Sequence, residues 1–399
     1  MYKFIENANA NEVDEFVFNH ELNSFNQCSK WVEVKNNWDS LLTCVKDDND
    51  KIVASALILF RRAPLGYTLA YIPKGPVMDY ENKELVEFTM NKLKEIAKRH
   101  KSFVLKIDPP VLSKKYKYKD RKKDNPLMNE EVINHLKALG AKHLGYTKMI
   151  SEATQPRFNA MVEIDDNFKE SIPHKTIRSI EKAKHKGATI YTGIEELSNF
   201  AKCMHYTEDR KGIALRNEDY FKNMIEAFDG KYILEVSKLN FPKQIEYLEK
   251  TIKENKDKLA AATNKKEIEA LNKLIKDDEE ELARDKEDYQ RLNKEEILLC
   301  GLLAIYNDNL MELLYMGNNP DGMRIRSSYY LYQYAMDYCI EHGIKKCSFG
   351  GIEGTLDDGL TIFKSNWPMY VEEYIGEFNF VLNGLVNFAY EKAYAMMRK

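Results

Sequence analysis

A helical hairpin in the middle of the chain constrains the fold more than any other feature of the sequence. Mostly apolar residues recur at steps of three and four from Ile245 to Ala262, and again from Ile268 to Leu292. This is the spacing of a coiled-coil seam. Between the two runs the phase breaks at AATNKKE, whose Asn and Thr suit a helix–helix turn. The pattern predicts an antiparallel coiled-coil arm over 242–295, which projects roughly 30–40 Å at about 1.5 Å per residue.

The charges of this arm are mixed in sign. Mixed charge favours a solvated arm that has a structural role or docks to a partner, over an arm that binds RNA tightly. Direct contact with RNA is the alternative.

The rest of the chain alternates strand and helix patterns, and this predicts an α/β (α+β) body. Strands are expected over 41–45 and 52–64, a helix over 83–99, and a further strand at SFVLKI that Pro109 and Pro110 terminate. A similar order recurs from about residue 160 onward, interrupted by the arm. The second half is therefore expected to repeat the first in outline.

Composition and charge exclude several classes of protein. The chain has 60 basic and 63 acidic residues, so its net charge of −3 argues against wholesale coating of nucleic acid. Its six cysteines lie far apart without a C-x-x-C pair, which indicates reduced thiols. The sequence shows neither a secretory signal nor the ~20 continuous apolar residues of a membrane span. We therefore expect a cytoplasmic protein whose membrane contact, if any, is peripheral.

The common catalytic signatures are missing from the sequence. There is no G-x-x-x-x-G-K-[ST], H-E-x-x-H, G-x-S-x-G or EF-hand loop, and FGGIEG lacks dinucleotide-loop spacing. Two basic stretches remain. SKKYKYKDRKK (113–123) is either a phosphate- or base-binding segment or a solvated loop, and the helix around 176–186 is favoured as ordinary and amphipathic.

Several short segments, taken in order, resemble the Fem family of peptidyltransferases (FemA, FemB, FemX and the MurM type). They cover nearly the whole chain and are SFNQCSKWVEVKNNW (24–38), VLKIDPP (104–110), IRSIEKAKHKGATI (177–190), DRKGI (209–213), LLYMGN (313–318), and FGGIEGTLDDGLTIFKSNWP running into YIGEFNF. The last element is the most specific. The inserted hairpin also resembles the arm of the FemA branch.

This resemblance implies a fold of two GNAT-like acyltransferase domains, with the arm inserted in the second domain. The expected boundaries are 1–150 plus 376–399 for the first domain, 151–241 plus 296–375 for the second, and 242–295 for the arm. It also implies an activity, which is transfer of an aminoacyl group from aminoacyl-tRNA to an amine of a peptidoglycan precursor. That acceptor is either lipid II or UDP-MurNAc-pentapeptide. No metal or cofactor is implied, and a homodimer or a Fem paralogue is a candidate partner.

The resemblance also assigns roles to particular residues. Lys364 is expected to face the reacting carbonyl, and Asp108 to orient or deprotonate the amine. The expected substrate-binding residues are Lys35, Trp38, Arg210, Arg216, Tyr315 and Glu377, with Lys35 and Arg210 on the nucleotide diphosphate and Arg216 as the substitute for Arg210. Fixed positive charge suits a diphosphate, and an ester is already activated for attack by an amine. Lys35 and Lys364 are expected to converge on one site, in a groove between the halves.

Each assignment has an ordinary structural alternative. Lys35 and Lys364 are also compatible with surface lysines, Asp108 with a turn before Pro109, and Tyr315 with a core strand. NWP after the FK pair departs from the glycine-bearing sequence usual in the family, which affects the local loop. Two other functions compete: an acyl-CoA-dependent GNAT N-acyltransferase, although no Q/R-x-x-G-x-G/A loop is present, and a non-catalytic coiled-coil adaptor.

Overall fold

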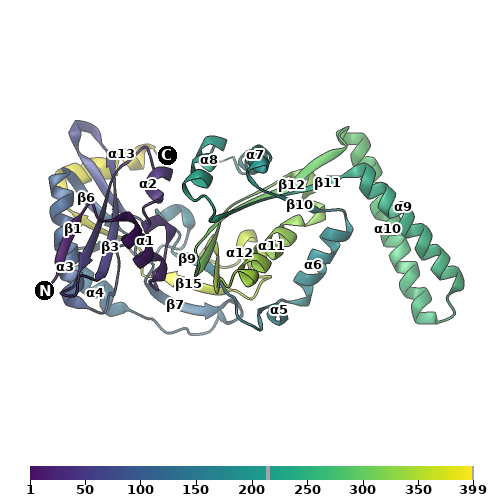
Figure 1. The fold of residues 1–399 in the computed structure, drawn as a ribbon, viewed down its shortest axis with the longest axis horizontal. Helices are drawn as coiled ribbons and strands as arrows, with labels where there is room; N and C mark the ends of the chain where they lie inside the picture. Colours follow the sequence, from purple (N-terminus) through teal and green to yellow (C-terminus); the bar gives the residue numbers. More distant parts are fainter. Residues whose placement is uncertain (213–215, 398–399) are drawn as a thin grey trace.

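The protein consists of two mixed β-sheets with covering helices and a helical arm. The structure is a computed structural model that describes residues 1–212 and 216–397. Figure 1 shows the first sheet and the arm at opposite ends of the molecule, with the second sheet between them.

The first sheet contains the N-terminal strands and one strand from near the C-terminus. Its order is β1 (Lys3–Glu6), β2 (Asp39–Lys46), β3 (Ile52–Arg62), β4 (Thr68–Ile72), β6 (Ser102–Ile107), β16 (Phe378–Val381) and β8 (Lys142–His143), with β5 (Val77–Met78) paired to β3. Only β4 and β6 run parallel, and α3 (Lys83–Arg99) connects them. The other helices of this half are α1 (Ala10–Asn19), α2 (Trp31–Val34), α4 (Glu130–Ala138) and α13 (Gly384–Met397).

The second sheet repeats this plan. Its order is β10 (Thr189–Thr192), β11 (Tyr232–Asn240), β12 (Glu296–Tyr306), β13 (Leu310–Asn318), β14 (Lys346–Ile352), β9 (Phe158–Glu163), β15 (Tyr370–Tyr374) and β7 (Leu112–Lys117). Again one pair, β13 and β14, is parallel, and α11 (Ser327–Glu341) connects it. The remaining helices are α5 (Phe168–Ser171), α6 (His174–His185), α7 (Leu197–Lys211), α8 (Glu218–Ala227) and α12 (Gly359–Lys364).

The two halves therefore share one order of strand directions, with antiparallel strands followed by a single helix-bridged parallel pair. This confirms the predicted α/β fold of two related halves. One segment differs from the expected division. β7 belongs to the second sheet, although it falls within 1–150. It also contains part of the basic stretch 113–123, and there Lys115 pairs with Glu163 at 2.6 Å while Tyr116 is buried.

An apolar core joins the two halves. β3 is apolar almost throughout because both of its faces are covered: Ile58 and Phe60 pack under α3, whereas Leu57 and Leu59 face the other half. On that second face Leu57 and Leu59 share a cluster with Phe221 of α8. A continuous apolar cluster of this kind fixes the relative position of the halves.

The arm consists of α9 (Phe241–Ala261) and α10 (Lys265–Leu292). Asn240 caps α9 and Asn264 caps α10, each through its side-chain oxygen. The predicted hairpin is present, with a short turn at 262–264, and Leu248, Ile252 and Leu271 are buried along its seam. Charged pairs also cross between the helices, as in Lys286–Glu249 at 2.6 Å.

The base of the arm is held to the second half by ion pairs. Asp278 and Asp285 occupy predicted seam positions, yet both are buried against basic residues of the body. His185 contacts Asp278 at 2.7 Å, and Arg324 contacts Asp285, Asp288 and Glu281. The acidic seam positions are thus explained by contact with the body, which sets the direction of the arm.

We expect Arg324→Met to lower the free energy of unfolding by about 1–3 kcal/mol, because it leaves Glu281 and Asp285 without their main cation. Burial already raises the pKa of Asp285 to about 6. Without the guanidinium that pKa rises further, so the loss is larger at pH 8 than at pH 5. Urea unfolding at both pH values measures it. Arg284→Met is the control, because Arg284 is 55% exposed and its pairs are weak. An equal loss of unfolding free energy in both variants would contradict the view that Arg324 holds the arm to the body.

Glu235 of β11 is fully buried, and neither carboxylate oxygen has a hydrogen-bond partner within the described residues. Burial raises its pKa well above the usual value. The folded protein therefore keeps a proton that the unfolded chain releases, so stability falls as pH rises above the ordinary glutamate pKa. We expect Glu235→Met to raise the free energy of unfolding by roughly 1–3 kcal/mol at pH 8 and less at pH 5. Thermal unfolding tests this, with Glu235→Gln as the uncharged polar control.

Candidate active site

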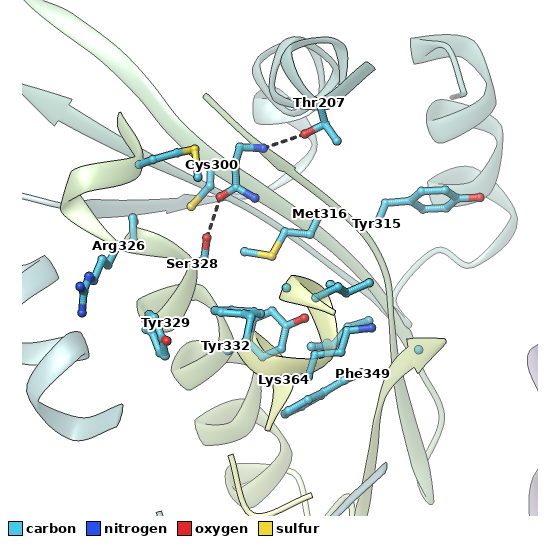
Figure 2. A pocket seen from close by; sticks show the side chains of 18 of the residues that line it. Thr207, Cys300, Tyr315, Met316, Arg326, Ser328, Tyr329, Tyr332, Phe349 and Lys364 are labelled. Carbon is cyan, nitrogen blue, oxygen red and sulfur yellow. Dashed lines mark hydrogen bonds between the residues drawn. The ribbon is translucent and has the colours of Figure 1, made fainter. Parts of the chain in front are cut away.

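The second half contains a cavity of about 630 Å³, here called cavity A. It lies where β13 and β14 meet α12 and the 3-10 segment Pro320–Ile325. Figure 2 shows Tyr315, Met316, Tyr332, Phe349 and Lys364 around it. The hydroxyl of Ser328 donates to the Asn318 side chain at 2.6 Å, which joins α11 to β13 at the wall.

Lys364 is buried in the wall of cavity A, not exposed in an open cleft. It is the last residue of α12, whose N-terminus Asp358 caps, and it is 5% exposed. Its ammonium donates to the Gly351 carbonyl at 2.9 Å. Gly350 has φ of 78°, a conformation that favours glycine. The alternative that Lys364 is an ordinary surface lysine is therefore wrong, and loss of its side chain would leave the Gly351 oxygen with one donor fewer.

A second cavity, of about 690 Å³ and here called cavity B, is lined mainly by residues of the first half, with Arg216 contributed by the second. Lys35, Trp38 and Arg216 line it. The Lys35 ammonium lies 4.9 Å from the Trp31 ring and 5.5 Å from the Tyr220 ring. Burial, with a smaller effect of Arg216, lowers the pKa of Lys35 to about 8. Cavity B is therefore a cationic and aromatic site.

The two cavities adjoin at a pair of tyrosines. The hydroxyls of Tyr315 and Tyr220 are 3.4 Å apart, and their rings meet edge to face. Tyr315 lines cavity A, whereas Tyr220 contacts Lys35 of cavity B. The expectation that Lys35 and Lys364 converge in one cavity is thus wrong, because each lines its own cavity.

The two candidate arginines are divided in the same way. Arg210 lines cavity A, and Arg216 lines cavity B beside Lys35. The Arg216 guanidinium lies 5.0 Å from the Tyr220 ring. Geometry therefore favours Arg216 as the cation that acts together with Lys35. Ile213, the last residue of the DRKGI segment, lies outside the described residues.

Asp108 lies in a small pocket next to cavity B, lined also by Lys74, Tyr374 and Glu377. The Tyr71 hydroxyl donates to Asp108 at 2.7 Å, and the Lys74 backbone N–H at 2.6 Å. Burial raises the pKa of Asp108 to about 7, against the opposing charge of Lys74. A carboxyl with a pKa near neutrality is able both to accept and to release a proton.

Sequence reasoning missed Lys74, a charged neighbour of Asp108, and Glu312, a second carboxyl that interacts with Lys74. Lys74 lies 4.4 Å from the Tyr374 ring, and burial lowers its pKa although nearby carboxylates raise it. Glu312 of β13 has its pKa raised to about 7 by burial, with Lys74 opposing. Lys74 thus links carboxyls from both halves. The sequence offers one signal for Lys74, which is the turn PKGP (73–76) directly after a strand. Nothing in the sequence shows that this turn lies near β13.

Glu377 lines both cavity B and the small pocket. It forms an ion pair with Lys106 at 2.8 Å and accepts the backbone N–H of Thr154. These contacts anchor the segment that follows Ser151, so the carboxylate shapes the wall between the two pockets.

Within residues 1–212 and 216–397, no group of three or more His, Cys, Asp or Glu side chains is placed to hold a metal ion. No helix in this part of the chain combines the length and apolar character needed to cross a bilayer.

Known proteins resemble this chain over nearly its whole length. The FemAB family profile matches residues 8–395. The lipid II:glycine glycyltransferase of Staphylococcus aureus (strain USA300) is 31% identical over 398 residues, covering 93% of this chain and 91% of the relative. The same enzyme of strain Mu50 / ATCC 700699 is 30% identical. The crystal structure of FemX superposes with a TM-score of 0.75 and 29% identity, over 96% of this chain and 98% of that one.

These findings define the class of protein as an aminoacyltransferase, as the sequence predicted. The chain belongs to the FemAB family.

Proposed function

We propose that the protein transfers an aminoacyl group from aminoacyl-tRNA to an amine on the stem peptide of a peptidoglycan precursor, with a lipid-linked acceptor such as lipid II favoured over UDP-MurNAc-pentapeptide. The observation that carries the proposal is the pair of adjoining cavities, one rich in cations and aromatic rings and one with a buried ammonium. A two-substrate transfer needs two such sites that meet at the point of reaction. The named relatives, which are lipid II:glycine glycyltransferases, support this choice of acceptor.

Cavity B suits the diphosphate-bearing acceptor. Lys35 and Arg216 supply positive charge on the same wall, and Trp31 and Trp38 supply flat apolar surfaces. A diphosphate attracts such paired cations, and sugar or base rings pack on aromatic faces. The stem peptide of an acceptor bound here runs toward the tyrosine junction.

Cavity A suits the aminoacyl ester. In the reaction the acceptor amine forms a C–N bond to the ester carbonyl carbon, the ester C–O bond breaks, and the tRNA hydroxyl leaves with a proton. The positive charge of Lys364 stabilises the oxyanion that develops on the carbonyl. The burial that raises the pKa of Asp108 to about 7 supports the role proposed for it, which is to orient the amine or take its proton.

The direct test is transfer of radiolabelled glycine from glycyl-tRNA to purified lipid II by the purified protein. We expect Lys364→Met to reduce kcat at least 100-fold, because a charge that acts on the developing oxyanion is lost. Lys364 is buried, so the variant also loses about 1–2 kcal/mol of stability through the unpaired Gly351 oxygen. Assays are therefore run well below its melting temperature.

Lys345→Met, at an exposed position before β14, is the matched control. Absence of transfer by the wild-type protein to either lipid II or UDP-MurNAc-pentapeptide, across several aminoacyl-tRNAs, would overturn the proposal.

The pH dependence of acceptor binding tests the role of Lys35. Its pKa is about 8 in the free protein, so its charge is lost as pH rises through that value. We expect affinity for UDP-MurNAc-pentapeptide to fall about tenfold between pH 7 and pH 9, as the ionised fraction falls. Lys35→Arg keeps its charge and should remove most of this dependence, whereas Lys35→Met should bind weakly at both pH values. Isothermal calorimetry measures all three, and a flat wild-type profile would exclude Lys35 from diphosphate binding.

A further inference from the structure

Helix α13 leaves a stripe of apolar side chains in solvent. Leu385, Phe388 and Met396 are 86%, 58% and 71% exposed and share this stripe with Lys392. The side that faces the body is mixed: buried Asn387 lines cavity B together with Tyr390, whose ring packs on Phe103. A surface helix of a soluble protein normally turns its apolar stripe inward. The exposed stripe indicates that something apolar covers the outer face.

A second exposed apolar residue lies at the same end of the first half. Leu65, at the tip of the turn between β3 and β4, is 93% exposed. The backbone places this tip beside α13. Thr68 N–H donates to the Lys101 carbonyl at 3.2 Å, and Asn383 N–H donates to the Phe103 carbonyl at 3.0 Å. The 63–67 turn and the start of α13 therefore flank the start of β6. Figure 1 shows α13 and β6 in the half of the molecule opposite the arm.

The charge around these residues is mainly positive. Arg61, Lys98, Lys101 and Lys392 are exposed at this end. Asp39 is paired with Arg62 at 3.1 Å, and Glu391 accepts from Asn387. Exposed leucine and phenylalanine side chains surrounded by basic residues are typical of a surface that binds at the headgroups of anionic lipids.

We propose that this surface, formed by the 63–67 turn, Lys101 and the outer stripe of α13, docks peripherally on a bilayer that contains anionic phospholipid. The inference rests on the proposed function, because a lipid-linked acceptor keeps its diphosphate at the membrane surface. Asn387 and Glu391 of α13 form part of the wall of cavity B. Docking through the other side of the same helix brings that cavity to the headgroups, so the acceptor enters without leaving the bilayer.

The test uses the full chain and vesicles without any peptidoglycan precursor, so that it does not depend on transferase activity. Wild-type protein should co-sediment with phosphatidylglycerol/phosphatidylcholine vesicles (1:1) and bind at least tenfold more weakly to phosphatidylcholine alone. Leu385→Asp/Phe388→Asp should weaken binding to the anionic vesicles at least tenfold. Leu65→Asp, in a separate turn, should weaken it severalfold. Leu274→Asp, at a 49% exposed position on the arm, is the matched control and should bind like wild type.

Activity then separates this proposal from the previous one. The α13 variant should transfer to detergent-solubilised lipid II within twofold of wild type, and at least tenfold more slowly to lipid II in vesicles. If no protein transfers to any acceptor, the proposed function fails, while the sedimentation result still decides the docking surface. Wild-type protein that stays in the supernatant, or Leu385→Asp/Phe388→Asp and Leu65→Asp variants that sediment like wild type, would overturn the proposal. The proposal would also be overturned if the wild-type protein is a dimer and the Leu385→Asp/Phe388→Asp variant is a monomer, because the outer face of α13 would then join two copies of the chain.

Discussion

The apolar contact between the two halves is the constraint on which the rest of the structure depends. Leu57 and Leu59 of β3 pack in one cluster with Phe200 and Phe221 of the second half. Burial of aromatic and branched side chains on this scale is strongly favourable, and the close packing prevents the two halves from sliding past each other. It holds the two cavities side by side, because Tyr220 stands on α8 beside Phe221, and the Phe221 ring also contacts Tyr315 of β13.

Close to this core the structure tolerates buried charge where chemistry needs it. Lys74 compensates Asp108 from the first half and Glu312 from the second, and both carboxyls have pKa values near 7. Removing such groups from water is costly unless opposite charges accompany them. Glu235 shows the contrasting case, since it is buried and neither a cation nor a hydrogen-bond donor from the described part of the chain reaches it. Asp108 and Glu312 can therefore gain or lose a proton near neutral pH, whereas Glu235 stays protonated.

Sequence patterns predicted most of the secondary structure because periodicity is a local property. The helix at 83–99 and the strand at 52–64 match α3 and β3 closely, and the arm is a hairpin of two helices as expected. The patterns failed where the structure depends on contacts between residues far apart in the sequence. The basic stretch at 113–123 gave no sign that β7 crosses to the second sheet, because strand pairing depends on a partner more than 250 residues away. Asp278 and Asp285 fitted the seam, yet they face basic residues of the body.

The sequence by itself determined the fold class, the inserted arm and the family, since all three depend on residue order and spacing along the chain. Only the tertiary structure decided how the site residues are distributed: Lys35 with Arg216 in one cavity, Lys364 in another, and Asp108 in a small pocket next to the first. It also decided which lysine is buried and which face of α13 stays exposed. The reason is that distance through space and access to water arise from packing between segments far apart in sequence, and no local pattern encodes them.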